Sequence, residues 1–152
     1  MIQEPYESRI PADPAYLQAV GRAFYNFTYL EWIVVWTIVK LSSDGFGSVP
    51  KGKPSGYIAS ALIKAIDATA PPLSSGLRKS LAKFHRNFLA AIDSRNKLLH
   101  AHPYTAPGGM QQLGGAGIEW PLEEVIATAK QFEAIAIEGN AIFYGSLAKE
   151  RP

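Results

Sequence analysis

The stretch from about residue 14 to residue 41 limits most strongly what this chain can fold into. Asp13 followed by Pro14 suits the N-cap and first turn of a helix, and the Ser/Asp/Gly run at 42–45 suits its end. Two apolar rows recur at helical spacing between them: Tyr25, Tyr29, Trp32 and Trp36, and Phe27, Leu30, Val34 and Ile38. From Tyr29 onward the helix is apolar nearly all round, which is typical of a helix buried on several sides. A small bundle covers such a helix poorly, so we expect a homodimer.

The remaining sequence predicts three more helices. Residues 57–68, 75–101 and 121–147 carry apolar residues every three to four positions, and prolines stand at their borders. Residues 43–56 and 103–119 are rich in glycine and lack strand patterning, so we expect loops, the second of which is functional or mobile. The sum is an all-α, antiparallel four- to five-helix bundle in a single domain spanning residues 1–152.

Composition narrows the class of protein further. Apolar residues make up 47% of the 152 residues, whereas charged residues make up only 18%, against about a quarter in an average domain. There is no cysteine for disulfides or thiolate metal sites. The N-terminal segment has acids and prolines where a signal peptide needs a basic start, and the apolar run 32–39 is shorter than the ~20 residues of a membrane span. We therefore expect a soluble, cytoplasmic protein with no membrane partner.

Basic residues gather in the third predicted helix. Six of them lie between residues 78 and 102, against the single acid Asp93: Arg78, Lys79, Lys83, Arg86, Arg95 and Lys97. A strip of this kind attracts a phosphate backbone, and Lys83, Arg86 and Lys97 are the expected RNA contacts. The alternative is a solvated helix face that happens to be basic.

Polar residues replace apolar ones near the end of this helix. Arg95 continues the apolar row seven residues after Phe88, Asn96 is its neighbour, and His100 follows Asn96 by one turn. Arg95 and His100 are about 140° apart around an ideal helix, a gap that the long arginine side chain can bridge. An imidazole moves protons near neutral pH, and a guanidinium holds a phosphate while charge develops. This pair suits RNA cleavage without a metal or other cofactor; the alternative is a polar network that holds the helix end in place.

The segment SRNKLLHAHPY resembles the signature of the HEPN superfamily: arginine, a polar residue, apolar residues and then histidine, late in a long helix. The stretch FTYLEWIVVWTIVKL is similar to that family's first long helix, with Glu31 interrupting an apolar surface. The resemblance implies a dimer with a composite cleft at the two-fold axis and metal-independent endoribonuclease activity of toxin or defence type, which leaves a 2′,3′-cyclic phosphate. It gives His100 the acid/base role, Arg95 the phosphate contact and Asn96 a positioning role.

The resemblance also leaves alternatives open. His102 fits the longer spacing that the family tolerates, so either histidine can be the functional one. Tyr104 follows His102 at the spacing at which, in a related toxin subfamily, a nucleotidyltransferase partner attaches AMP, and an antitoxin is a further expected partner. Glu31 can orient His100 or pair with Arg95, or it is a buried acid that a local donor satisfies. Two other functions remain: a non-catalytic HEPN-like module that binds nucleotide, RNA or protein, and a structural helical interaction protein.

Overall fold

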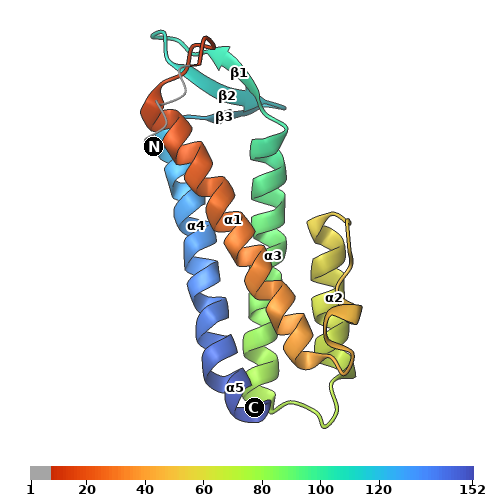
Figure 1. The fold of residues 1–152 in the computed structure, drawn as a ribbon. Helices are drawn as coiled ribbons and strands as arrows, with labels where there is room; N and C mark the ends of the chain where they lie inside the picture. Colours follow the sequence, from red (N-terminus) through yellow and green to blue (C-terminus); the bar gives the residue numbers. More distant parts are fainter. Residues whose placement is uncertain (1–7) are drawn as a thin grey trace, which may run out of the picture.

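The structure, a computed structural model, describes residues 8–152 and contains three long helices, a shorter one and a small sheet at one end (Figure 1). The elements in chain order are α1 (Pro14–Leu41), η1 (Gly45–Ser48), α2 (Ser55–Ala68), α3 (Ser75–Leu99), β1 (His102–Thr105), β2 (Gln111–Gly115), β3 (Ile118–Trp120), α4 (Leu122–Ile142), η2 (Phe143–Leu147) and α5 (Ala148–Glu150). The expectation of a mostly helical fold is therefore confirmed. Residues 1–7, half of the N-terminal segment considered above, lie outside the described residues.

Helix α1 begins where the capping pattern indicates. The Asp13 carboxylate accepts the backbone N–H groups of Ala15 at 2.9 Å and Tyr16 at 3.1 Å, which satisfies two donors that the first helical turn leaves unpaired. The helix ends at Leu41, and its extended C-cap residue Ser42 donates its backbone N–H to the carbonyl of Ile38. No helix within residues 8–152 combines the length and hydropathy that crossing a membrane requires.

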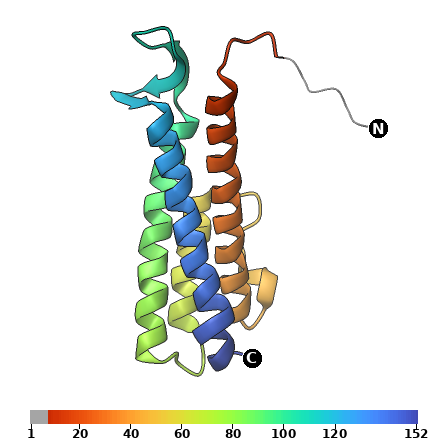
Figure 2. The same ribbon diagram turned by 90° about the vertical axis from the view of Figure 1, so that its left-hand side faces the viewer.

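The long helices α1, α3 and α4 run side by side, and α2 packs beside the lower half of α1 and α3 (Figures 1 and 2). Three phenylalanines join the three long helices in the core. The Phe27 ring of α1 stacks on Phe88 of α3, with centroids 6.2 Å apart, and meets Phe132 of α4 edge-on at 5.4 Å. All three side chains are buried.

Close approach of the helices depends on Gly139 in α4. A Cβ at this position would lie 2.5 Å from the Phe84 ring of α3 and 2.9 Å from the Ile33 side chain of α1. A larger side chain would fit there only if the Phe84 and Ile33 side chains moved. The absence of a side chain at Gly139 thus allows these two residues to pack directly against α4.

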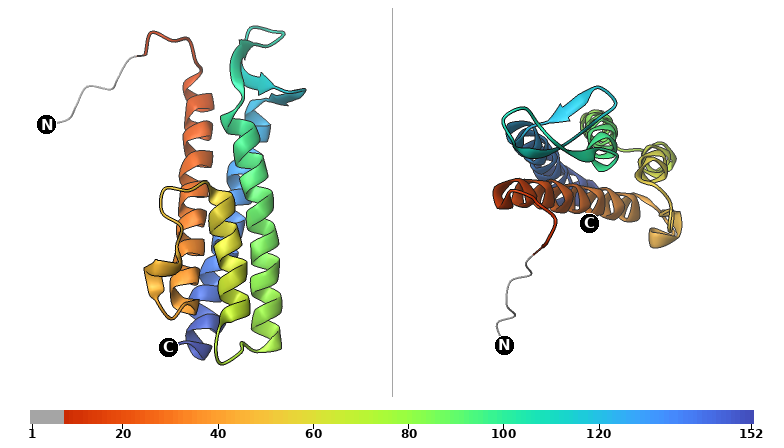
Figure 3. Two further views of the ribbon diagram at one scale, coloured as in Figure 1. Left: turned by 90° about the vertical axis from the view of Figure 1, so that its right-hand side faces the viewer. Right: turned by 90° about the horizontal axis from the view of Figure 1, so that it is seen from above.

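The expectation of a structureless loop at 103–119 is wrong. Residues 102–120 contain a three-stranded antiparallel sheet of order β1-β2-β3, which covers the end of the bundle (Figure 3). The Tyr16 hydroxyl of α1 fastens it, donating to the Trp120 carbonyl at 2.6 Å and accepting the Leu113 N–H at 2.9 Å. Burial raises the pKa of Tyr16, while the Leu113 N–H acts in the opposite direction.

Four helix borders also differ from the expected ones. Helix α2 begins at Ser55, two residues early, and α3 ends at Leu99, two residues early. Helix α4 begins at Leu122 and ends at Ile142, after which the chain continues as the π-helical turn η2. The α3 border matters most, because it removes His100 from the helix and makes it the C-cap residue.

Candidate functional site

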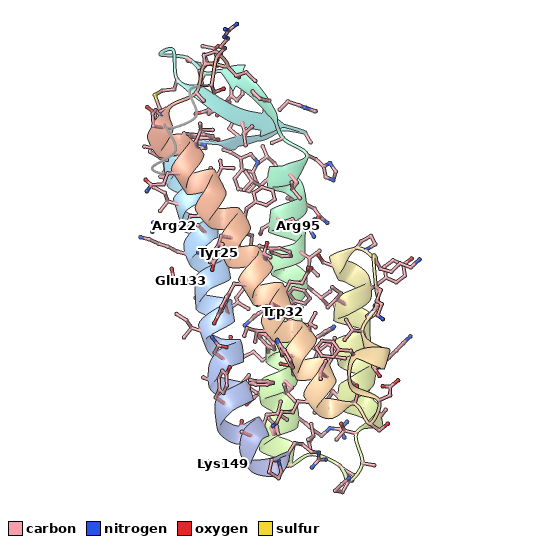
Figure 4. The ribbon with its side chains drawn as sticks, in the orientation of Figure 1. Arg22, Tyr25, Trp32, Arg95, Glu133 and Lys149 are labelled. Carbon is pink, nitrogen blue, oxygen red and sulfur yellow. The ribbon has the colours of Figure 1, made fainter. Side chains whose placement is uncertain are left out.

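The Arg95 side chain lies half-buried where α3 meets α1 and α2 (Figure 4). Its Nη2 donates a hydrogen bond to the Ser55 hydroxyl at 2.5 Å, and its guanidinium carbon lies 4.7 Å from the centroid of the Phe27 ring. A guanidinium held against an aromatic face loses mobility and gains a cation–π contact. Arg95 therefore has a fixed orientation in a single chain.

Glu31 joins Arg95 indirectly. The Ser55 hydroxyl donates to the Glu31 carboxylate while it accepts from Arg95, so a single hydroxyl links an acid on α1 to a base on α3. Among the roles expected for Glu31, these bonds give it a local donor, Ser55, which also links it indirectly to Arg95. The buried Nε of Arg95 has no hydrogen-bond partner among the described residues. This donor is enclosed by the surrounding side chains and is left unsatisfied in the single chain.

Asn96 and His100 are both exposed, and neither side chain makes a hydrogen bond within residues 8–152. The His100 backbone N–H donates to the Asn96 carbonyl at 3.0 Å, which is the last helical bond of α3. No hydrogen bond in this part of the chain joins His100 to Arg95 or Glu31. One chain therefore orients the guanidinium and leaves the imidazole free.

His102 and Tyr104 belong to the sheet and not to the helix end. They line a shallow hollow of about 620 Å³ on its outer face, together with Glu119. Register places His102 opposite Gly114, and Gly114 opposite Glu119, so both ionisable side chains lie on one face. The hydroxyl of half-buried Tyr104 accepts a hydrogen bond from Gln112 at 2.6 Å.

Two of the three basic residues expected to contact RNA are already paired. Lys97 forms an ion pair with Asp93 at 2.7 Å, and Lys83 forms one with Glu138 at 3.2 Å. Arg86 is exposed and makes no ion pair within the described range. Exposed ion pairs of this kind are weak and open easily in water. They therefore lower the net positive charge of the basic strip but leave both lysines able to contact a phosphate.

His85 is the third histidine, and it lies apart from the others against α2. Burial lowers its pKa below the ordinary value of 6.5, and the neighbouring Arg86 adds to this, while a contact with the Ala59 carbonyl opposes it. The side chain is half-buried. Because His85 lies between two helices, it is a packing residue. Its lowered pKa means that protonation at low pH should destabilise the fold.

Sequence reasoning missed Ser55, which is the centre of this network. The predicted loop at 43–56 included it, whereas the structure makes it the first residue of α2 and buries it. The preceding Pro54 was the available signal, because proline is common at helix starts. Nothing in the sequence indicated that the Ser55 hydroxyl meets Glu31 and Arg95.

Comparisons of the chain with protein-family models, curated proteins and solved structures found no match. The resemblance to the HEPN superfamily therefore depends on the quoted motifs alone. Within residues 8–152, no three His, Asp or Glu side chains are grouped to hold a metal ion. What the site offers is an oriented guanidinium, a linked carboxylate and an accessible imidazole.

Proposed function

We propose that this chain is a HEPN-type, metal-independent endoribonuclease that works as a homodimer, with Arg95 and His100 in one cleft. The observation that carries the proposal is the Arg95 guanidinium, which Ser55 and Phe27 hold in a fixed orientation and which lies five residues before an exposed histidine. The step from Arg95 to the C-cap residue His100 corresponds to a rise of about 7.5 Å along the helix axis, a distance that one RNA phosphodiester and its neighbouring groups can span.

The chemistry is attack of a ribose 2′-hydroxyl on the adjacent phosphorus. The His100 imidazole of one subunit takes the 2′-hydroxyl proton, the P–O5′ bond breaks, and the protonated imidazole of the other subunit gives a proton to the departing 5′-oxygen. The products are a 2′,3′-cyclic phosphate and a 5′-hydroxyl. Arg95 stabilises the negative charge that develops on the non-bridging phosphate oxygens.

An uncovered aromatic face on α1 supports the dimer. Three aromatic side chains with exposed fractions between 44% and 73% recur at helical spacing along one side of it: Tyr25, Tyr29 and Trp32. Figure 4 shows Tyr25 and Trp32 on this side of the helix. A contiguous apolar surface of this kind is typical of a protein interface. Glu31, at the end of the Arg95 network, directly precedes Trp32 in α1 and lies about 100° from it around the helix. The proposed cleft therefore requires a second copy that covers this face and also reaches the Arg95 network.

The decisive experiment is cleavage of a labelled RNA oligonucleotide in EDTA by the wild type and by Arg95→Ala, His100→Ala and His102→Ala. We expect cleavage by the wild type and by His102→Ala, and a loss of at least about a hundredfold in the other two, since acid–base residues contribute 10²–10⁴-fold. Cleavage lost with His102→Ala instead would transfer the proton-transfer role to His102. Cleavage unaffected by Arg95→Ala and His100→Ala would refute the proposal.

The rival function is a non-catalytic module that binds RNA or nucleotide with the same residues. It is favoured by the single-chain geometry, in which Arg95 is already bonded to Ser55 and His100 has no side-chain partner among the described residues. This function predicts RNA binding that weakens in Arg95→Ala, with no cleavage by the wild type. Attachment of AMP to Tyr104 by a nucleotidyltransferase partner is a further proposal that depends on the resemblance to the HEPN superfamily. It would require the Tyr104 hydroxyl to lose the hydrogen bond that it accepts from Gln112.

A further inference from the structure

A second hollow lies in the half of the bundle that is farther from the sheet. Its volume is about 660 Å³, and its wall is formed by the end of α1, the segment 42–50, one face along α2, and Arg151 after α5. Lys40, Lys64 and Arg151 line it, as do the hydroxyl-bearing residues Ser42 and Ser60, and the lining contains no Asp or Glu. The hollow is therefore basic and rich in hydroxyl groups.

None of these three basic side chains has an acidic partner in residues 8–152. The Lys40 ammonium lies 5.8 Å from the centroid of the Phe143 ring. Arg151 uses two of its nitrogens on the backbone carbonyls of Glu150 and Pro71. A guanidinium has five N–H donors, so Arg151 keeps donors for a ligand.

The simplest alternative is that these cations only offset the helix ends. The C-termini of α1 and α2 both reach the hollow, and each carries about half a negative charge. Three full positive charges exceed this by about +2, and the Glu150 carboxylate, which interacts electrostatically with Arg151, reduces the excess to about +1. The Leu41 carbonyl, at the end of α1, is moreover already satisfied by the Thr69 hydroxyl. The charge excess matches a phosphorylated ligand.

An aromatic hollow adjoins the basic one. It has a volume of about 450 Å³ and is lined by Trp36 and Phe143, and it shares Lys40 and Arg151 with its neighbour. Two cations thus separate a basic, hydroxyl-lined space from a space walled by aromatic rings. A nucleotide has this division, with a phosphate tail and a flat base that stacks on aromatic side chains.

We propose that this double hollow binds a free nucleoside polyphosphate. The phosphates lie against Lys40, Lys64 and Arg151, and the base lies against Trp36 and Phe143. The site is in the half of the bundle that is farther from His100 and shares no residue with the Arg95 network (Figure 1). It is therefore independent of the proposed ribonuclease activity.

The test is calorimetric titration of the full chain with ATP, GTP and inorganic tripolyphosphate. We expect ATP or GTP to bind more tightly than tripolyphosphate, because only a nucleotide fills both hollows. The charge-reversal variant Lys64→Glu should weaken nucleotide binding by roughly tenfold or more, as loss of a charged contact does. The matched control is Lys79→Glu, which reverses an exposed lysine of α3 that has no ion pair in the described chain and should leave binding unchanged.

A second variant separates the base from the phosphates. Trp36→Leu should weaken binding of ATP or GTP and leave binding of tripolyphosphate unchanged. The proposal is overturned by no nucleotide binding at millimolar concentration, by equal losses in Lys64→Glu and Lys79→Glu, or by tripolyphosphate binding as tightly as the nucleotides. Each readout is binding, so none depends on whether the chain cleaves RNA.

Discussion

Arg95 donates a hydrogen bond to the hydroxyl of Ser55, forty positions earlier in the chain. This contact joins α3 to the first residue of α2, and the same hydroxyl continues the link to α1 through Glu31. A hydroxyl can accept one bond and donate another, so a small residue is sufficient to connect a base to an acid. The arrangement orients the guanidinium without the full charge neutralisation of a direct ion pair.

Replacing Ser55 with alanine should therefore affect both stability and the proposed activity. The variant leaves Arg95 and Glu31 without their shared partner, so we expect the free energy of unfolding to fall by about 1–3 kcal/mol in urea denaturation. RNA cleavage should fall as well, because the guanidinium loses its orientation. Ser60→Ala, which removes an exposed hydroxyl of the same helix, should change neither quantity. Equal behaviour of the two variants would show that the network has no role.

Removal of the Tyr16 hydroxyl should loosen the sheet. Tyr16→Phe leaves the Leu113 N–H and the Trp120 carbonyl unpaired, which should cost about 1–3 kcal/mol of unfolding free energy. Hydrogen exchange at the Leu113 amide should become faster. Tyr25→Phe is the matched control, because the Tyr25 side chain is 73% exposed. Unchanged exchange at Leu113 in Tyr16→Phe would contradict the fastening role.

A methyl group at position 139 should be damaging. Gly139→Ala forces a Cβ against Phe84 and Ile33, and overpacking of this kind costs about 1–3 kcal/mol. Gly21→Ala in α1 has nothing within 4 Å of the added Cβ and should stabilise the helix by about 0.5–1 kcal/mol. Thermal denaturation of the two variants should therefore move the midpoint in opposite directions. A Gly139→Ala variant as stable as the wild type would mean that the helices do not cross this closely.

His85 should make the fold sensitive to acid. Its pKa is lowered in the folded chain, so below pH 6.5 the unfolded state binds the proton more readily. The stability contributed by the neutral imidazole is fully present above pH 6.5 and is lost as the pH falls through the lower folded pKa. In His85→Gln, the decline of unfolding free energy just below pH 6.5 should be smaller. An identical pH profile in the variant and the wild type would exclude His85 as its source.

The periodicity of the sequence was sufficient to predict the helices. The cap residues Asp13 and Ser42 border α1 as the sequence indicated, because local backbone bonding decides such borders. The sheet was not predictable in this way. Its strands are only three to five residues long, Gly114 and Gly115 interrupt the alternation, and pairing with the Tyr16 hydroxyl is a long-range contact that no local pattern reveals.

The candidate site also contains one residue that local sequence patterns predicted and one that depends on a long-range contact. Arg95 was recognisable because a charged residue in an apolar row must find polar partners. Its partner Ser55 was not, because the contact depends on how α2 packs against α3. His100 lies outside the helix because the chain turns into β1 only two residues later. The sequence pattern predicted no strand there, so the expected helix extended to residue 101 and included His100.

The central claim is that two copies of the chain bring their Arg95–His100 sets together, and single cysteines test it most directly. The chain has no cysteine, so His100→Cys introduces one thiol, and Lys149→Cys places one at the opposite end of the bundle (Figure 4). A short bismaleimide added to each variant is followed by denaturing electrophoresis. The account predicts a covalent dimer for His100→Cys and only monomer for Lys149→Cys. Failure of His100→Cys to cross-link in a chain that sediments as a monomer would contradict the shared cleft.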